Sequence, residues 1–127
     1  DVYKRQGKYI YLNFWATWCA SCIQNMTLIP ELKKTYGGKV VFISVSVDKK
    51  QEEVKNFIKK NPKLSPEKNG PGRIYLFSDN YKKVKEEFNV LTVPAYYMID
   101  PKGNVLHSPA ANPADIEPEL QKIKQRK

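Results

Sequence analysis

Two long apolar runs dominate the hydrophobic pattern of the chain. Residues 9–16 (YIYLNFWA) and 40–48 (VVFISVSVD) are nearly continuous stretches of aromatic and branched residues, which is typical of strands buried on both faces of a sheet. Between them, over residues 20–36, apolar residues recur at roughly helical spacing, and Pro30 predicts a kink in that helix. A strand, helix, strand unit is normally parallel with a right-handed crossover. The junction between the first strand and the helix is therefore expected at the carboxyl edge of the sheet.

The rest of the chain continues the alternation of strands and helices. The expected elements are a helix over residues 51–60, a strand at 73–77, a helix over 80–88, a strand at 95–100 and a last helix from about Pro113 to Lys124. Turn residues at 101–104 (PKGN) predict a hairpin into VLHS, whereas residues 61–72, with three prolines and two glycines, are predicted to be a loop. This order predicts an α/β fold in a single domain over residues 1–127.

Composition and charge limit the classes of function. With 127 residues, 41% hydrophobic and 28% charged, the chain has the make-up of one soluble globular domain. The formal charge of +9 is spread over lysines of predicted helix faces and is not accompanied by a recognition motif, so we expect no nucleic-acid partner. The charge favours acidic partners or an anionic membrane surface. No apolar segment preceded by basic residues stands at the start, so we expect any signal peptide or anchor to lie outside this sequence.

The candidate chemistry belongs to Cys19 and Cys22, the two cysteines of the chain, which lie where the first strand meets the first helix. Unpaired backbone N–H groups and the helix dipole at such a position favour a thiolate, and they lower a cysteine pKa from about 8.5 to between about 3.5 and 7.5. Cys22 is one helical turn further on, within reach of a mixed disulfide at Cys19. We therefore assign Cys19 as the attacking thiol and Cys22 as the resolving thiol.

A CxxC motif is also half of a zinc site. Structural zinc takes four Cys or His ligands, and outside the motif the chain offers only His107, for which we expect a surface position near the hairpin. A closed zinc site within one chain is therefore not expected. We predict neither a metal nor a cofactor.

Two segments carry a resemblance to a known family. NFWATWCASC, residues 13–22, resembles the active-site segment of the thioredoxin superfamily, and its leading asparagine is closest to the TlpA/ResA-like branch. NVLTVPAYYMIDPKGNV, residues 89–105, resembles the loop with a proline in cis that is followed by a strand and a hairpin in that family. The resemblance implies a thioredoxin fold, with a central mixed β-sheet and helices on both faces.

The resemblance also implies roles for residues around the cysteines. Pro94 would follow a cis peptide bond after Val93 and face the cysteines, and the backbone of Val93 would pair with an extended substrate segment. Trp18 would form an aromatic rim beside Cys19, and Trp15 would pack beneath the site. A trans proline in an ordinary loop is the alternative for Pro94, and core packing is the alternative for both tryptophans.

The sequence departs from the family pattern at three positions. Thioredoxins carry a buried aspartate where this chain has Asn13, which cannot take a proton. The TlpA/ResA-like branch often has glutamate and proline at the positions of Asn25 and Thr27. No obvious general base for Cys22 stands near the motif, so we expect Cys22 to titrate high and resolution to be slower than the first attack.

The resemblance implies an enzyme that reduces or exchanges protein disulfides, acting on proteins with disulfides or thiols. It would work as a monomer in the cell envelope or periplasm, with a membrane thiol reductase as electron donor; a cytoplasmic location stays open. The alternatives are a disulfide oxidase or isomerase, a non-catalytic peptide-binding module and, less favoured, a peroxidase. Potentials in the superfamily span about −270 to −120 mV, so inspection of the motif does not set the direction of electron flow.

Overall fold

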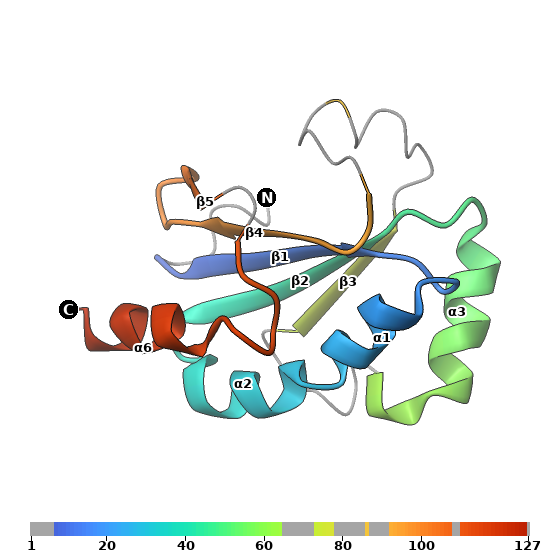
Figure 1. Cartoon of the computed structure of the whole chain (residues 1–127), viewed down its shortest axis with the longest axis horizontal. Helices are drawn as coiled ribbons and strands as arrows, with labels where there is room; N and C mark the ends of the chain where they lie inside the picture. The colour runs from blue at the N-terminus through green and yellow to red at the C-terminus, as the bar shows by residue number, and fades with distance from the viewer. Residues whose placement is uncertain (1–6, 65–72, 78–85, 87–91, 108–109, 127) are drawn as a thin grey trace.

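The computed structural model describes residues 7–64, 73–77, 86, 92–107 and 110–126. A five-stranded sheet of order β3-β2-β1-β4-β5 forms its centre (Figure 1). The strands are β1 Tyr9–Trp15, β2 Val40–Ser46, β3 Arg73–Phe77, β4 Ala95–Ile99 and β5 Val105–His107. β1, β2 and β3 are parallel, while β4 is antiparallel to both β1 and β5. The sheet is therefore mixed, as expected.

Helices pack along the sheet. They are α1 Ala20–Met26, α2 Ile29–Tyr36, α3 Gln51–Lys60 and α6 Glu117–Gln125, with a 3-10 helix, η2, at Pro62–Leu64. Figure 1 shows the four α-helices along one side of the sheet. The predicted helix over 80–88 and most of the predicted loop over 61–72 lie outside the described residues. No helix in the described part of the chain is long and apolar enough to cross a membrane.

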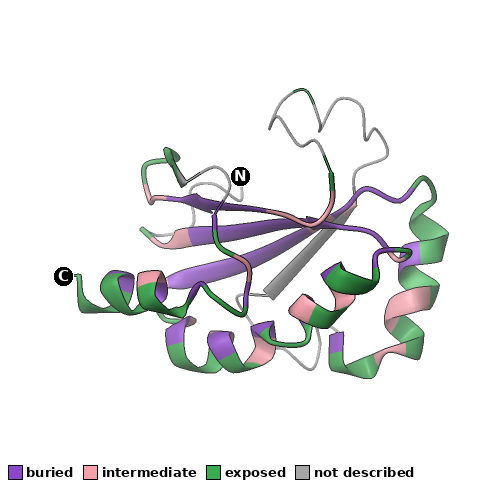
Figure 2. Ribbon diagram, viewed as in Figure 1, coloured by how far each residue is buried: buried purple, intermediate pink, exposed green. Residues whose placement is uncertain are grey.

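The core lies between the central strands and these helices. Every residue of β1 except Tyr9, and every residue of β2 except Val45, is buried (Figure 2). Consecutive residues of these strands, which point to opposite faces, are thus both buried, and this explains why both strands show continuous apolar runs in place of an alternation. The helices contribute narrower apolar stripes, such as Leu120 and Ile123 of α6.

The prediction of one kinked helix over residues 20–36 is wrong. It is two helices, because α1 ends at Met26 and α2 begins at Ile29, with Pro30 in its first turn. A proline ring collides with the carbonyl four residues earlier, here that of Met26, but it fits the first turn of a helix, where its missing N–H is not needed. The hydroxyl of Thr27, the C-cap of α1, donates to the carbonyl of Gln24 at 2.6 Å. The chain therefore restarts a helix at this proline.

The last helix starts later than predicted. It begins at Glu117, whereas the expected start was about Pro113. The side chain of Asn112 accepts a hydrogen bond from the N–H of Ala114 at 2.8 Å, and the N–H of Asp115 donates to the carbonyl of Asn112 at 2.9 Å. An Asn side chain that bonds the backbone two residues on favours a turn over a helix.

Candidate active site

The site begins where β1 ends in a tight turn. The N–H of Cys19 donates to the carbonyl of Ala16 at 3.1 Å, which closes the turn. Cys19 is the N-cap of α1, with extended backbone angles (φ −100°, ψ 97°), and its Sγ accepts a hydrogen bond from the N–H of Cys22 at 3.2 Å. The predicted place of the motif, at the start of the helix after the first buried strand, is confirmed.

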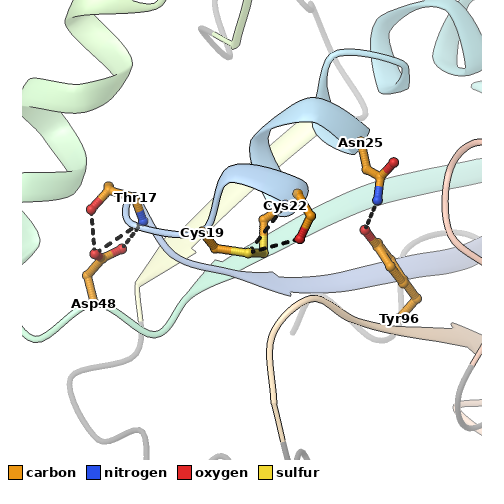
Figure 3. The surroundings of a disulfide bond; sticks show 7 residues. Thr17, Cys19, Cys22, Asn25, Asp48 and Tyr96 are labelled. Atoms are coloured by element: carbon orange, nitrogen blue, oxygen red, sulfur yellow. Dashed lines mark hydrogen bonds between the residues drawn. A yellow bond between two sulfur atoms is a disulfide. The ribbon is translucent and has the colours of Figure 1, made fainter.

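The two cysteines form a disulfide. Their Sγ atoms are 2.21 Å apart and their Cα atoms 5.3 Å apart (Figure 3). Cys19 is 7% exposed, whereas Cys22 is fully buried. The hydroxyl of Ser21 lies 3.6 Å from the sulfur of Cys19. Of the two residues, Cys19 alone meets solvent, which is the order that an attacking and a resolving thiol require.

The two tryptophans near the motif have opposite environments. Trp18, directly before Cys19, is 68% exposed, so its indole adds apolar surface beside the sulfur. Trp15 is fully buried, and its ring lies 5.9 Å from that of Phe57 on α3. The structure thus places one tryptophan at the surface of the site and the other in the core.

The Val93–Pro94 segment leads into β4 at the same edge of the sheet. The peptide bond between the two residues is cis, and both side chains are half-buried. β4 pairs Ala95 with Phe14 in antiparallel register. In this antiparallel register, the residue before Ala95, which is Pro94, lies beside the residue after Phe14, which is the last residue of β1. Pro94 is therefore near the end of the strand that leads to the cysteines.

Sequence reasoning missed one carboxylate at the site. Asp48 follows β2, is 2% exposed, and accepts hydrogen bonds from the backbone N–H and the hydroxyl of Thr17, two residues before Cys19 (Figure 3). The available signal was its position, because an aspartate that ends a buried parallel strand lies at the same sheet edge as the motif that follows the neighbouring strand.

Residues 7–105 match the model of a family described as thioredoxin-like. The chain belongs to the thioredoxin-like family. It is 32% identical over 101 residues to the thioredoxin-like protein YneN of Bacillus subtilis and 30% identical over 102 residues to the thiol-disulfide oxidoreductase ResA of Bacillus thuringiensis. These alignments cover 77% and 80% of the chain and 54% of each relative, so the chain spans about half the length of these relatives.

A solved thioredoxin-like structure has the same fold. It is the pneumococcal exposed lipoprotein thioredoxin of Streptococcus pneumoniae, with a TM-score of 0.71 and 26% identity, covering 95% of this chain and 87% of that one. The thioredoxin-like fold predicted from the two sequence segments is therefore confirmed.

Asn13, where the sequence departs from the family pattern, lies on β1 beside β2. Asn13 is 2% exposed and its Oδ1 accepts a hydrogen bond from the hydroxyl of Ser44, its partner on β2. Its Nδ2 has no hydrogen-bond partner among the residues that the structure describes. Asn13 therefore presents a donor where a carboxylate would present a proton acceptor.

The side chain of Asn25 reaches across from α1 to β4. Its Nδ2 donates to the hydroxyl of Tyr96 at 3.2 Å (Figure 3). Tyr96 is 5% exposed, and burial raises the pKa of its phenol. The hydroxyl of Tyr96 thus ties the helix that carries Cys22 to the strand that follows Pro94.

Metal ligands are sparse around the motif. Within the described ranges, no three His, Cys, Asp or Glu side chains come together in a group that could hold a metal ion. His107 belongs to β5 and pairs with Met98 of β4, at the hairpin where the sequence placed it.

Proposed function

We propose that this chain is the catalytic domain of a thiol-disulfide oxidoreductase that reduces protein disulfides. The observation that supports this most directly is the Cys19–Cys22 disulfide at the start of α1, of which only Cys19 meets solvent. The relative ResA carries the name of this activity. A pair of cysteines that can close a disulfide in a folded site has the chemistry needed to take two electrons to and from a partner.

In the reduced protein, the thiolate of Cys19 attacks one sulfur of a substrate disulfide. A mixed disulfide forms, the substrate S–S bond breaks, and the departing substrate sulfur takes a proton from water. Cys22 then loses its proton and attacks Sγ of Cys19, which releases the second substrate sulfur as a thiol. The substrate disulfide is reduced to two thiols while Cys19 and Cys22 are oxidised to the disulfide. A dithiol donor returns the pair to its reduced form.

The hydrogen bond from the N–H of Cys22 to the sulfur of Cys19 supports the first step. A hydrogen bond to a charged acceptor is roughly twice as strong as one between neutral groups, so this contact stabilises the thiolate more than the thiol. Asn13 supplies no carboxylate for Cys22, so we expect the second step to be the slower one.

Trp18, Val93 and Pro94 form the substrate-binding surface in this proposal. Trp18 offers exposed apolar area beside Cys19. Val93 precedes β4 and stands in neither of the ladders that β4 makes with β1 and β5, so its backbone can pair with an extended substrate segment. The substrates are then proteins with exposed disulfides or thiols, recognised through the backbone next to a cysteine.

We further propose that the domain acts in the cell envelope as a monomer, with a membrane thiol reductase as its donor. The structural relative from Streptococcus pneumoniae is an exposed lipoprotein, which supports an extracytoplasmic site of action. The formal charge of +9 favours a position close to an anionic membrane surface.

Trapping of the mixed disulfide tests the assignment of the two thiols. The Cys22→Ser variant, mixed with insulin, accumulates a covalent adduct on non-reducing gels that reductant releases, whereas Cys19→Ser forms none. The parent protein accelerates the dithiothreitol-driven precipitation of insulin, and Cys19→Ser does not. Equal adduct in the parent and Cys22→Ser, or adduct with Cys19→Ser only, would show that the roles are wrong. Inactivity of the parent would refute the proposed function.

A further inference from the structure

Asp48 joins the loop after β2 to the turn that precedes the cysteines. Its Oδ2 accepts the backbone N–H of Thr17 at 3.0 Å, and its Oδ1 accepts the hydroxyl of Thr17 at 2.7 Å. The hydroxyl of Ser46 donates to Oδ2 at 2.6 Å and accepts the N–H of Asp48 at 3.0 Å. A buried carboxylate is tolerated when hydrogen bonds replace its hydration, and here Thr17 and Ser46 provide them.

Thr17, the residue that Asp48 holds, lies in the turn that leads to Cys19. Thr17 lies inside the turn closed by the bond between Ala16 and Cys19. Cys19 follows this turn with extended backbone angles, and its sulfur, which is bonded to that of Cys22, lies 3.2 Å from the N–H of Cys22. With both hydrogen-bond donors of Thr17 bound by one buried carboxylate, the turn has little freedom to move the sulfur away from that N–H.

We propose that Asp48 is a positioning residue for Cys19, which holds Thr17 and thereby keeps the Cys19 sulfur on the N–H that stabilises its thiolate. The proposal rests on the proposed function for its biological meaning, but it concerns a property of the thiol that can be measured without any substrate protein. Asp48 acts through Thr17 and does not touch the reacting sulfurs in this proposal.

Positioning and direct charge make opposite predictions. A negative charge near Cys19 disfavours a thiolate, so removal of the carboxylate would make the thiol more acidic if charge alone mattered. If Asp48 acts by positioning, its removal loosens the turn, weakens the N–H contact to the sulfur and makes the thiol less acidic. Substitution of Thr17 loosens the same turn while the charge stays.

The experiment measures the pH dependence of iodoacetamide alkylation in the Cys22→Ser background, where Cys19 is the single thiol of the chain. In this background we expect Asp48→Ala and Thr17→Val to move the midpoint upward by about one pH unit, which is a tenfold fall in the thiolate population below the midpoint. Thr17→Ser retains the hydroxyl and should restore the parent midpoint. Thr27→Val removes a threonine hydroxyl bond at the other end of α1 and is the matched control, expected to leave the midpoint unchanged.

The outcomes separate this proposal from the proposed function. An unchanged or lower midpoint in both Asp48→Ala and Thr17→Val would overturn the positioning role, whatever the activity of the parent. If Asp48→Ala does not fold, Thr17→Val decides, because it keeps the shape of the side chain. Inactivity of the parent toward insulin would refute the function, and the alkylation profiles would still judge the role of Asp48.

Discussion

The hydrogen bond between Asn25 and Tyr96 connects two parts of the site that are far apart in the sequence. Asn25 is three residues after Cys22 on α1, and Tyr96 is two residues after Pro94. We predict that the substitutions Asn25→Ala and Tyr96→Phe are coupled energetically. The double variant should lose less stability than the sum of the two single variants.

The structure gives the size of each effect. Tyr96 is buried and its ring is stacked on Tyr11, with ring centroids 5.9 Å apart, so phenylalanine keeps the packing and loses one neutral hydrogen bond, about 0.5–1.5 kcal/mol. Asn25→Ala leaves a buried phenol without its donor, for which the loss is roughly 1–3 kcal/mol. Because the double variant removes both partners, we expect a coupling free energy of about 1 kcal/mol.

Urea unfolding of the four proteins measures this coupling. With a urea m-value of about 1–3 kcal/mol/M, a change of about 1 kcal/mol moves the midpoint by roughly 0.3–1 M, which is well resolved. All four proteins should be compared in the same redox state, because the disulfide itself changes stability. Free-energy changes that add within about 0.3 kcal/mol would show that the contact does not link the helix to the strand, and the reasoning would fail.

Three further predictions concern stability. Gly103→Ala should lower the melting temperature by several degrees, because Gly103 has φ +93° and a side chain at that angle costs about 1 kcal/mol. Gly38→Ala is the control and should show no such fall, because an added Cβ at Gly38 has open space and its φ is not positive. Hydrogen bonds from the backbone and side chain of Asn104 hold the pKa of Asp100 below its usual value. The stability that Asp100 contributes is therefore present above its pKa in the unfolded chain and is lost as pH falls through its pKa in the folded protein. In thermal melts from pH 5 to pH 2, Asp100→Asn should lose less stability than the parent, and equal losses would contradict this. Asn13→Asp introduces a buried acid whose folded pKa is raised by desolvation, so it should be near parent stability at pH 4 and progressively less stable as pH rises; a loss that does not vary with pH would refute it.

The sequence predicted the parts of the fold that depend on local pattern. Consecutive residues of β1 and β2 are buried, so both strands appear in the sequence as continuous apolar runs, and these runs predicted them. The position of Cys19 and Cys22 followed from the order of strand and helix, and the hairpin into β5 followed from the turn residues at 101–104. In these cases the residues that determine the structure are neighbours in the chain.

The rest of the site depends on contacts between distant residues. Thr17 and Asp48 are 31 positions apart, and Asn25 and Tyr96 are 71 apart, so no local pattern marks either pair. The break at Pro30 was misjudged for another reason. A proline within a helical pattern is compatible both with a kink and with a restart of the helix, and the pattern alone does not distinguish them.

The meeting of Thr17 and Asp48 follows from the parallel register of the sheet. β1 and β2 are in register from Tyr9 with Val40 to Trp15 with Ser46, and the N–H of Val47 continues the ladder by donating to the carbonyl of Trp15 at 2.9 Å. Thr17 is two residues past Trp15, and Asp48 is two residues past Ser46. Two strands that run the same way and end together bring the residues at equal distances beyond their ends to one place. The crossover through α1 and α2 thus sets the cysteines at the carboxyl edge and also provides the carboxylate that holds their turn.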